Sequence, residues 1–200
     1  MCLAVFVLSF VSLWSILDPN CMASLLETLL SDYERHHRSL RNMAIWAIAN
    51  YRFGRWAEQL PPGFREIGGK VYGAMSLFVE ASSGMILPRE VQVGKDFHLV
   101  HAGNTRIHPQ TVIGDRVGIM HDVTVGTTPD SSGVATIGDD VFIGAGAKIL
   151  GPVKIGDRAR IAANSLVISD VPADTTAIGV PARILRYTGR SVGDSSASDR

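Results

Sequence analysis

The sequence predicts a mostly β protein, in which a solenoid of short parallel strands follows a short helical region. A branched aliphatic residue returns at every sixth position, and only the position of Ser131 breaks the ladder. Neither a helix nor an alternating strand gives a strict period of six. A solenoid does, because each short strand turns one branched side chain into the core. The ladder consists of Ile107, Ile113, Ile119, Val125, Ile137, Ile143, Ile149, Ile155, Ile161 and Val167.

The composition fits one domain with a small appendage and argues against several classes of protein. The chain has 200 residues, of which 46% are hydrophobic, and it carries 20 glycines. Its formal net charge is zero, so no strong attraction to nucleic acid is expected. The two cysteines are Cys2 and Cys21. The body of the chain therefore has neither a disulfide scaffold nor a cysteine zinc site.

Residues 1–17 are apolar or serine. They lack the basic start and the small-residue cleavage site of a signal peptide, and they are short for a membrane helix, which needs about 20 apolar residues. We favour a third interpretation, in which residues 1–21 come from an over-extended gene start and the protein begins at Met22. A membrane anchor is the alternative, and a membrane partner is expected only in that case.

Three helices are expected before the repeats, over residues 23–36, 41–59 and 64–82. The second is followed by Pro61 and a second proline, which interrupt a helix. We therefore assign residues 22–84 to an N-terminal helical region.

From residue 85 the six-residue period replaces the helical one. A β-helix domain is predicted over residues 85–187, and a disordered tail over residues 188–200. Three hexads close one triangular coil, so equivalent positions in successive coils stack about 4.8 Å apart. A small residue follows most ladder positions, which lets the chain turn a corner and lets coils approach each other. These small residues are Gly114, Gly126, Gly138, Gly144, Gly156 and Ala162.

Two histidines are predicted to share one corner of this β-helix. Leu99 and Ile107 are eight residues apart instead of six, so two residues are inserted between them. His101 and His121 each lie two places after a core position, and their separation equals one coil plus the insertion. An insertion in a strict ladder often makes room for a ligand, and neutral histidine commonly takes a proton from a hydroxyl. The alternative is one capping and one surface histidine; we favour a catalytic role for both.

Three segments of the chain carry longer motifs. They are residues 51–56 (YRFGRW), 143–151 (IGAGAKILG) and 175–184 (TTAIGVPARI). Together they resemble the serine acetyltransferase family of hexapeptide-repeat acyltransferases, and the resemblance extends over roughly residues 45–187. It implies a left-handed parallel β-helix, which is an exception to the right-handed crossover rule.

The resemblance also implies a homotrimer that binds acetyl-CoA between neighbouring subunits, with no metal. It implies that His101 is the general base that removes a proton from the acceptor hydroxyl. A cytoplasmic location is expected, because acetyl-CoA is made there. Small residues would expose backbone amides to the cofactor, and basic residues would bind its phosphates, although a solvated basic face is the alternative for the latter. The predicted cofactor-binding residues are Gly126, Gly144, Ala145, Gly146, Ala147, Lys148, Ala162, Ala163 and Arg183.

Three features of the family are missing from this chain. The family places an aspartate directly before the catalytic histidine and another fifteen residues before it, where this chain has Val100 and Ile86. The family's Arg-His pair is absent from the loop over residues 127–136. Free serine is a zwitterion, so a specific site needs a charged group for each end of it. The replacements therefore favour a neutral acceptor, such as a sugar or polysaccharide precursor, over L-serine.

The leading hypothesis is an acetyl-CoA-dependent O-acetyltransferase, in which His121, Asp122 or Glu90 orients His101. Two other classes stay open. A metal-dependent β-helix hydratase would need three converging histidines, of which the sequence offers two. A non-catalytic trimeric scaffold would fit the missing aspartates, but the intact cofactor motif argues against it.

Overall fold

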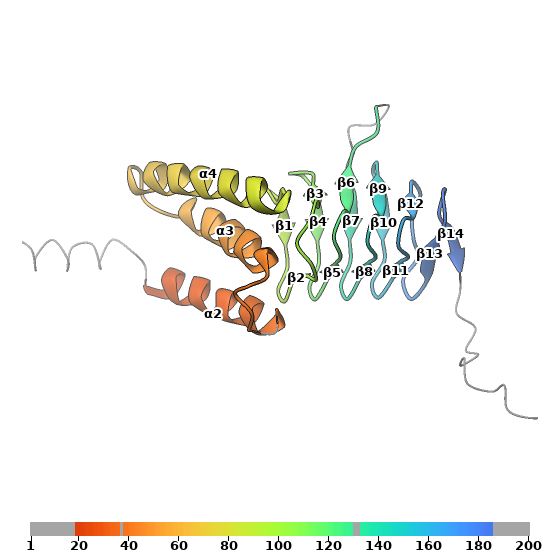
Figure 1. Ribbon diagram of the computed structural model, residues 1–200, viewed down its shortest axis with the longest axis horizontal. Coiled ribbons are helices and arrows are strands. Elements are labelled where there is room, and N and C mark those ends of the chain that lie inside the picture. Colours follow the sequence, from red (N-terminus) through yellow and green to blue (C-terminus); the bar gives the residue numbers. More distant parts are fainter. Residues whose placement is uncertain (1–18, 37, 130–132, 186–200) are drawn as a thin grey trace, which may run out of the picture.

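The computed structural model describes residues 19–36, 38–129 and 133–185. In this part of the chain, three helices lie at one end of a row of stacked β-coils (Figure 1). The predicted leader over residues 1–17, the ladder break at Ser131 and the predicted tail over residues 188–200 lie outside the described residues. None of the described helices is long and apolar enough to cross a membrane.

The three helices fall close to the predicted ranges: α2 (Pro19–Arg35), α3 (Met43–Ala57) and α4 (Phe64–Ser83). α3 begins after Asn42, whose side-chain oxygen accepts a hydrogen bond from Ala44 N at 3.0 Å and so caps the first turn. α4 ends at Gly84, which adopts a left-handed φ of 68° that glycine accommodates without strain.

The strands form three sheets, with one strand per hexad. The sheet orders are β1-β4-β7-β10, β3-β6-β9-β12 and β2-β5-β8-β11-β13-β14. Every third strand therefore stacks on the same face, as a triangular coil requires, and the predicted β-helix of hexapeptide repeats is confirmed. The bounds are β1 (Gln92–Val93), β2 (His98–Leu99), β3 (Arg106–Ile107), β4 (Val112–Ile113), β5 (Gly118–Ile119), β6 (Thr124–Gly126), β7 (Thr136–Ile137), β8 (Phe142–Ile143), β9 (Lys148–Leu150), β10 (Lys154–Ile155), β11 (Arg160–Ile161), β12 (Leu166–Val167), β13 (Thr176–Ile178) and β14 (Arg183–Leu185).

The last strand departs from the parallel pattern. β14 turns back and pairs antiparallel with β13, with Arg183 opposite Ile178. The turn passes through Gly179, whose φ of 103° favours glycine. This hairpin lies at the end of the row of coils farthest from the helices (Figure 1), where it covers part of an edge that would otherwise be open to another chain.

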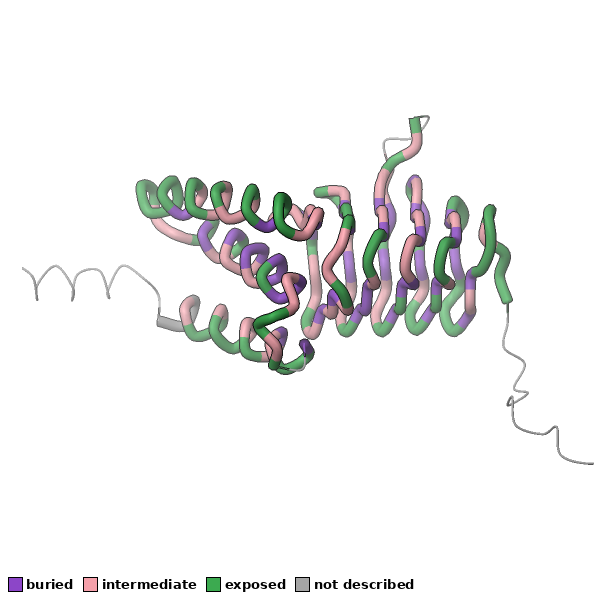
Figure 2. The backbone as a smooth tube through the Cα atoms, viewed as in Figure 1, coloured by how far each residue is buried: buried purple, intermediate pink, exposed green. Residues whose placement is uncertain are grey.

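Coil length varies in the two places where the ladder is irregular. Lys154 pairs with Thr136, which lies 18 residues earlier. Gly118 pairs with His98 over a separation of 20 residues, and Thr136 pairs with Val112 over 24. The strands on either side of each irregularity stay paired, so the stack of buried positions continues past both (Figure 2).

All ten ladder residues are buried, and none exposes more than 3% of its surface. After several of them, the spacing between coils requires glycine. A Cβ at Gly114 would lie 2.7 Å from the carbonyl carbon of Gly138 in the next coil. At the same corner, Asp139 Oδ1 accepts a hydrogen bond from Asp115 N, and Asp157 Oδ1 accepts one from Asp139 N, each at 2.9 Å. These carboxylates satisfy backbone donors where the coil turns.

The helices are fixed to the first coil by buried polar contacts. Arg52 Nε lies 2.9 Å from Asp32 Oδ2, and the same guanidinium donates to Val93 O at 3.2 Å and to Gly94 O at 2.8 Å. Asp32 is fully buried. Burial raises the pKa of its carboxyl above the usual range, while the hydrogen bond and charge of Arg52 oppose that rise. The Tyr51 hydroxyl donates to the carbonyl of Val91 at 2.7 Å. α3 is therefore a firm support for the coil that carries His101.

Candidate active site

His101 and His121 lie side by side at one corner of the β-helix. Leu99 pairs with Ile119 in β2 and β5, so the residues two places further on occupy equivalent positions in successive coils. The two imidazole rings are 6.0 Å apart between centroids and are inclined by 55°. Both residues are exposed. The shared corner predicted from the repeat is thus confirmed, and both rings can be reached by a ligand from solvent.

The two-residue insertion forms the bulge that follows His101. Gly103 has a φ of 141°, a conformation that a side chain would strain. Its carbonyl accepts hydrogen bonds from Asp122 N at 2.9 Å and from the buried Thr105 hydroxyl at 3.2 Å. A Cβ added to Gly103 would come within 3.4 Å of the Cβ of His121. The bulge is therefore closely packed against the second histidine and tied to the residue after it.

The two acidic candidates to orient His101 are each paired with a cation. Lys148 Nζ donates to Asp122 O at 2.7 Å and lies 3.3 Å from its carboxylate. Glu90 pairs with Arg89 at 3.5 Å. Asp122 and Glu90 were two of the candidates to orient His101. In the structure, the carboxylate of Asp122 faces Lys148 and that of Glu90 faces Arg89.

A residue that the sequence analysis did not single out reaches the histidine corner from the helical region. Asn42 Nδ2 donates to the carbonyl oxygen of Val100 at 3.2 Å. A helix was predicted to begin at residue 41, but that prediction carries no information about the contact between Asn42 and a coil 58 residues away in sequence.

The predicted cofactor residues come together in two successive coils. Ile143 of β8 pairs with Ile161 of β11. Gly144, which follows Ile143, therefore lies opposite Ala162 and Ala163, which follow Ile161. A Cβ at Gly144 would lie 2.6 Å from Ala163 N, so the glycine is required for the close approach of these coils. Ala147 is fully buried and can offer a ligand no side-chain surface. Ala145, Gly146, Lys148 and Ala162 are half-buried, and Ala163 is exposed.

Two further predicted cofactor residues lie farther along the chain. Gly126 ends β6 opposite Leu150 of β9 and is half-buried. Arg183 is exposed in β14, on the six-stranded sheet that also contains β11 and is two strands away from it. The backbone of Arg183 therefore belongs to the same sheet as β11, which ends directly before Ala162.

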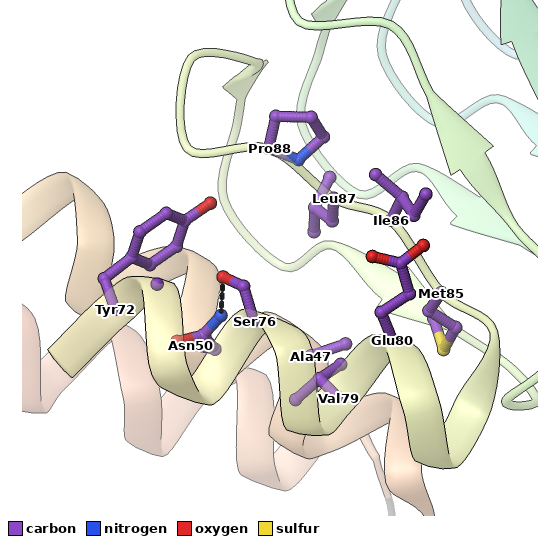
Figure 3. A pocket seen from close by; sticks show the side chains of 11 residues that line it. Ala47, Asn50, Tyr72, Ser76, Val79, Glu80, Met85, Ile86, Leu87 and Pro88 are labelled. Carbon is purple, nitrogen blue, oxygen red and sulfur yellow. Dashed lines mark hydrogen bonds between the residues drawn. The ribbon is translucent and has the colours of Figure 1, made fainter. Parts of the chain in front are cut away.

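A pocket of about 190 Å³ lies between α3, α4 and the start of the first coil (Figure 3). Its walls include Val79, Met85 and Pro88, and the amide of Asn50 donates to the hydroxyl of Ser76 inside it. None of its lining residues is a predicted site residue. The histidine corner is an open surface of the single chain, as expected if a second chain completes the site. Among the described residues, no group of three histidine, cysteine or acidic side chains could hold a metal ion.

A row of hexapeptide coils with one buried branched residue per strand is the architecture of hexapeptide-repeat β-helix proteins. Consistent with this class, the family model of the bacterial transferase hexapeptide (six repeats) matches residues 135–169.

The chain is similar to serine acetyltransferases of several organisms. The chain is 37% identical over 114 residues to the serine acetyltransferase of Helicobacter pylori, covering 56% of this chain and 67% of that one. It is 34% identical over 139 residues to the enzyme of Staphylococcus epidermidis, covering 68% of this chain and 64% of that relative. The crystal structure of the Brucella abortus enzyme in complex with coenzyme A superposes with a TM-score of 0.69 at 28% identity, covering 85% of this chain and 74% of that chain.

The chain belongs to the serine acetyltransferase family, and the resemblance predicted from its motifs is confirmed. It nevertheless spans just under two thirds of the length of the S. epidermidis relative.

Proposed function

We propose that this protein is an acetyl-CoA-dependent O-acetyltransferase in which His101 is the general base. The observation that carries the proposal is the His101–His121 pair, whose ring centroids lie 6.0 Å apart at an exposed corner. The coenzyme A complex of the B. abortus relative supports acetyl-CoA as the donor. A free imidazole at an accessible corner is the group that can take a proton from a hydroxyl near neutral pH.

The reaction requires one proton acceptor and no covalent enzyme intermediate. His101 removes the proton from the acceptor hydroxyl while the oxygen attacks the thioester carbonyl. The tetrahedral intermediate then expels the thiolate of coenzyme A, which takes the proton back from the histidinium. His121 lies near enough to hold the acceptor or to fix the orientation of His101. The base is reformed in each turnover, so neither a serine nor a cysteine nucleophile is needed.

We assign cofactor binding to the small-residue strip of two coils together with the basic residues at its ends. Gly146 and Ala163 would present backbone groups to the pantetheine amides, and Lys148 and Arg183 would contact the phosphates. For Lys148 this requires the ammonium to exchange its contact with the Asp122 carboxylate for a phosphate oxygen. A homotrimer, with the donor between neighbouring subunits, would close the histidine corner, which the single chain leaves open. We expect the reaction in the cytoplasm, where acetyl-CoA is made.

The acceptor is a neutral hydroxyl compound, a sugar or polysaccharide precursor, in preference to L-serine. The names of the relatives favour L-serine. The chain itself favours the sugar, because Val100 and Ile86 replace the two carboxylates expected near the base. Asp122, the residue after His121, already forms an ion pair with Lys148, so a zwitterion that used these two charges would have to break that pair.

The test measures coenzyme A release with a thiol-reactive dye, using a panel of acceptors that includes L-serine, free sugars and nucleotide sugars. We expect His101→Ala to reduce turnover by at least 100-fold, within the range of general-base contributions, while acetyl-CoA binding persists in calorimetry. The matched control is His108→Ala, because the His108 side chain accepts a hydrogen bond from Gln110 N in its own turn.

Full activity of His101→Ala would overturn the assignment of the base. Efficient turnover of L-serine would overturn the preference for a sugar, and no turnover with any acceptor by a chain that binds acetyl-CoA would favour the scaffold. Zinc bound in stoichiometric amount to the active protein would favour the hydratase.

A further inference from the structure

We propose that Asn42 is a positioning residue for His101, because it links the first turn of α3 to the peptide group that carries the histidine. The hydrogen bond from Asn42 Nδ2 to Val100 O fixes the oxygen of the peptide between Val100 and His101. The nitrogen of the same planar peptide belongs to His101. This inference rests on the proposed role of His101 as the base.

The chemistry of the side chain explains why asparagine stands here. Asn42 uses its amide oxygen to cap α3 by accepting from Ala44 N at 3.0 Å, and its amide nitrogen to donate to Val100 O at 3.2 Å. Asparagine, aspartate and serine cap a helix about equally well. Of these, asparagine alone combines the capping acceptor with an N–H donor that reaches in the opposite direction.

The surroundings of His101 show why such a link matters. Val100 occupies the position directly before the histidine and has no polar side-chain group that could orient it. On the other side, the chain continues through Ala102 into Gly103, whose φ of 141° suits glycine and whose carbonyl accepts a hydrogen bond from Asp122 N at 2.9 Å. Val100 N donates to Ile119 O at 2.9 Å, which leaves the Asn42 contact as the restraint on the peptide oxygen that comes from outside the coil.

The support behind Asn42 is rigid, so the link can define a position. One turn after another, α3 leads from Asn42 to Tyr51 and Arg52, which bind the carbonyls of Val91, Val93 and Gly94 at the start of the β-helix. The helix thus contacts the first coil through its N-cap and through two residues in its second half. A displacement of a reacting group by about 1 Å can reduce the rate by about 100-fold, so a contact of this kind affects catalysis more than its own strength indicates.

The experiment compares two variants that keep the cap and remove the donor, Asn42→Ser and Asn42→Asp. We expect both to unfold within about 2 °C of the unmodified protein, because the cap is retained. We expect kcat to fall roughly tenfold with the KM for acetyl-CoA unchanged. For Asn42→Ser the plateau of the pH profile of kcat falls while its acid limb stays in place, because the base is displaced and no charge is added near it.

Tyr51→Phe is the matched control, because it removes another hydrogen bond between α3 and the first coil. We expect it to lower stability and to leave kcat unchanged. If both cap-retaining variants keep the original kcat while His101→Ala is inactive, the positioning role is wrong and the proposed function stands. If kcat falls equally in Tyr51→Phe, the effect of Asn42 is a general consequence of loosened docking, which also overturns the inference. An active His101→Ala would overturn the proposed function itself, and this inference with it.

Discussion

Replacing Arg52 with methionine tests whether the joint between the helices and the β-helix depends on a buried ion pair. Arg52 donates to the carboxylate of Asp32, which is fully buried, and to the carbonyls of Val93 and Gly94. Methionine preserves much of the side-chain length but provides no donor. The carboxylate of Asp32 would then be buried without a partner, which costs about 3–5 kcal/mol when one member of a buried pair is removed.

The two carbonyls would each lose a hydrogen bond worth about 1 kcal/mol, although partial entry of water offsets some of this loss. We therefore expect Arg52→Met to lower the free energy of unfolding by about 4 kcal/mol at pH 7.5, a large part of the 5–15 kcal/mol typical of a domain. The double variant Asp32→Asn/Arg52→Met should recover about 2 kcal/mol of this loss, because no charge is left unpaired.

The pH dependence of this effect has a defined sign. Burial raises the pKa of Asp32 in the folded state, and Arg52 opposes that rise. Without Arg52 the folded-state pKa rises further. A carboxyl with a raised pKa contributes stability that is present below its unfolded pKa, near 3.8, and lost as the pH rises through the folded pKa. The deficit of Arg52→Met should therefore be smaller at pH 4.5 than at pH 7.5. The assay is urea unfolding followed by circular dichroism at both pH values. A deficit below about 1 kcal/mol at pH 7.5, or an equal deficit at both, would refute the buried-pair reasoning.

Two further predictions concern the β-helix. Gly144→Ala would place a Cβ 2.6 Å from Ala163 N; because this neighbour is backbone, we expect a loss of about 1–3 kcal/mol in thermal unfolding and a higher KM for acetyl-CoA. Gly73→Ala, whose Cβ would meet nothing within 4 Å, should be neutral or slightly stabilising, and equal losses in the two variants would contradict the role of coil spacing. Hydrogen bonds from Arg116 and Arg158 hold the pKa values of Asp140 and Asp174 below their usual range. The stability that these exposed pairs add is therefore present above about pH 4 and is lost as the pH falls through the lowered pKa values. The difference in unfolding free energy between the unmodified chain and Asp140→Asn/Asp174→Asn should therefore be small, should be reduced by salt and should vanish in acid; a difference that grows in acid would contradict it.

The repeat made the coils and the histidine corner predictable from sequence alone. Period six is a local property, so Ile119 and Leu99 could be assigned to the core, and the register of His101 against His121 followed by counting. The polar contacts between the helices and the first coil could not be derived in this way. Asn42 and Val100 are 58 residues apart, and Asp32 and Arg52 lie on different helices, so no periodicity relates these partners.

The same limit applies to the ends and edges of the site. The direction of β14 could not be derived from the sequence, because it depends on which edge its backbone groups meet. Lys148 was assigned to a phosphate because a basic residue followed the glycine motif. Its contact with Asp122 depends on the left-handed corner at that aspartate, where φ is 58°, and a local sequence pattern does not reveal which coil a long side chain reaches.

The two irregular coils suggest how a site can be built on a uniform solenoid without disturbing its core. If this coil had 18 residues, Leu99 would stack on Val117, and the ladder residues that follow would no longer lie opposite one another. The two residues inserted after His101 let Leu99 pair with Ile119, and the ladder then continues from Ile107 onto Val125 at the normal spacing. The insertion therefore changes only the corner, where it replaces a tight turn by a bulge next to an imidazole. The next coil holds this bulge through the hydrogen bond from Asp122 N to Gly103 O, and the peptide oxygen directly before His101 accepts a hydrogen bond from the helical region. The amide of Asn42 supplies this second contact, so the helix docked against the first coil reaches the histidine corner in addition to packing against the hydrophobic core.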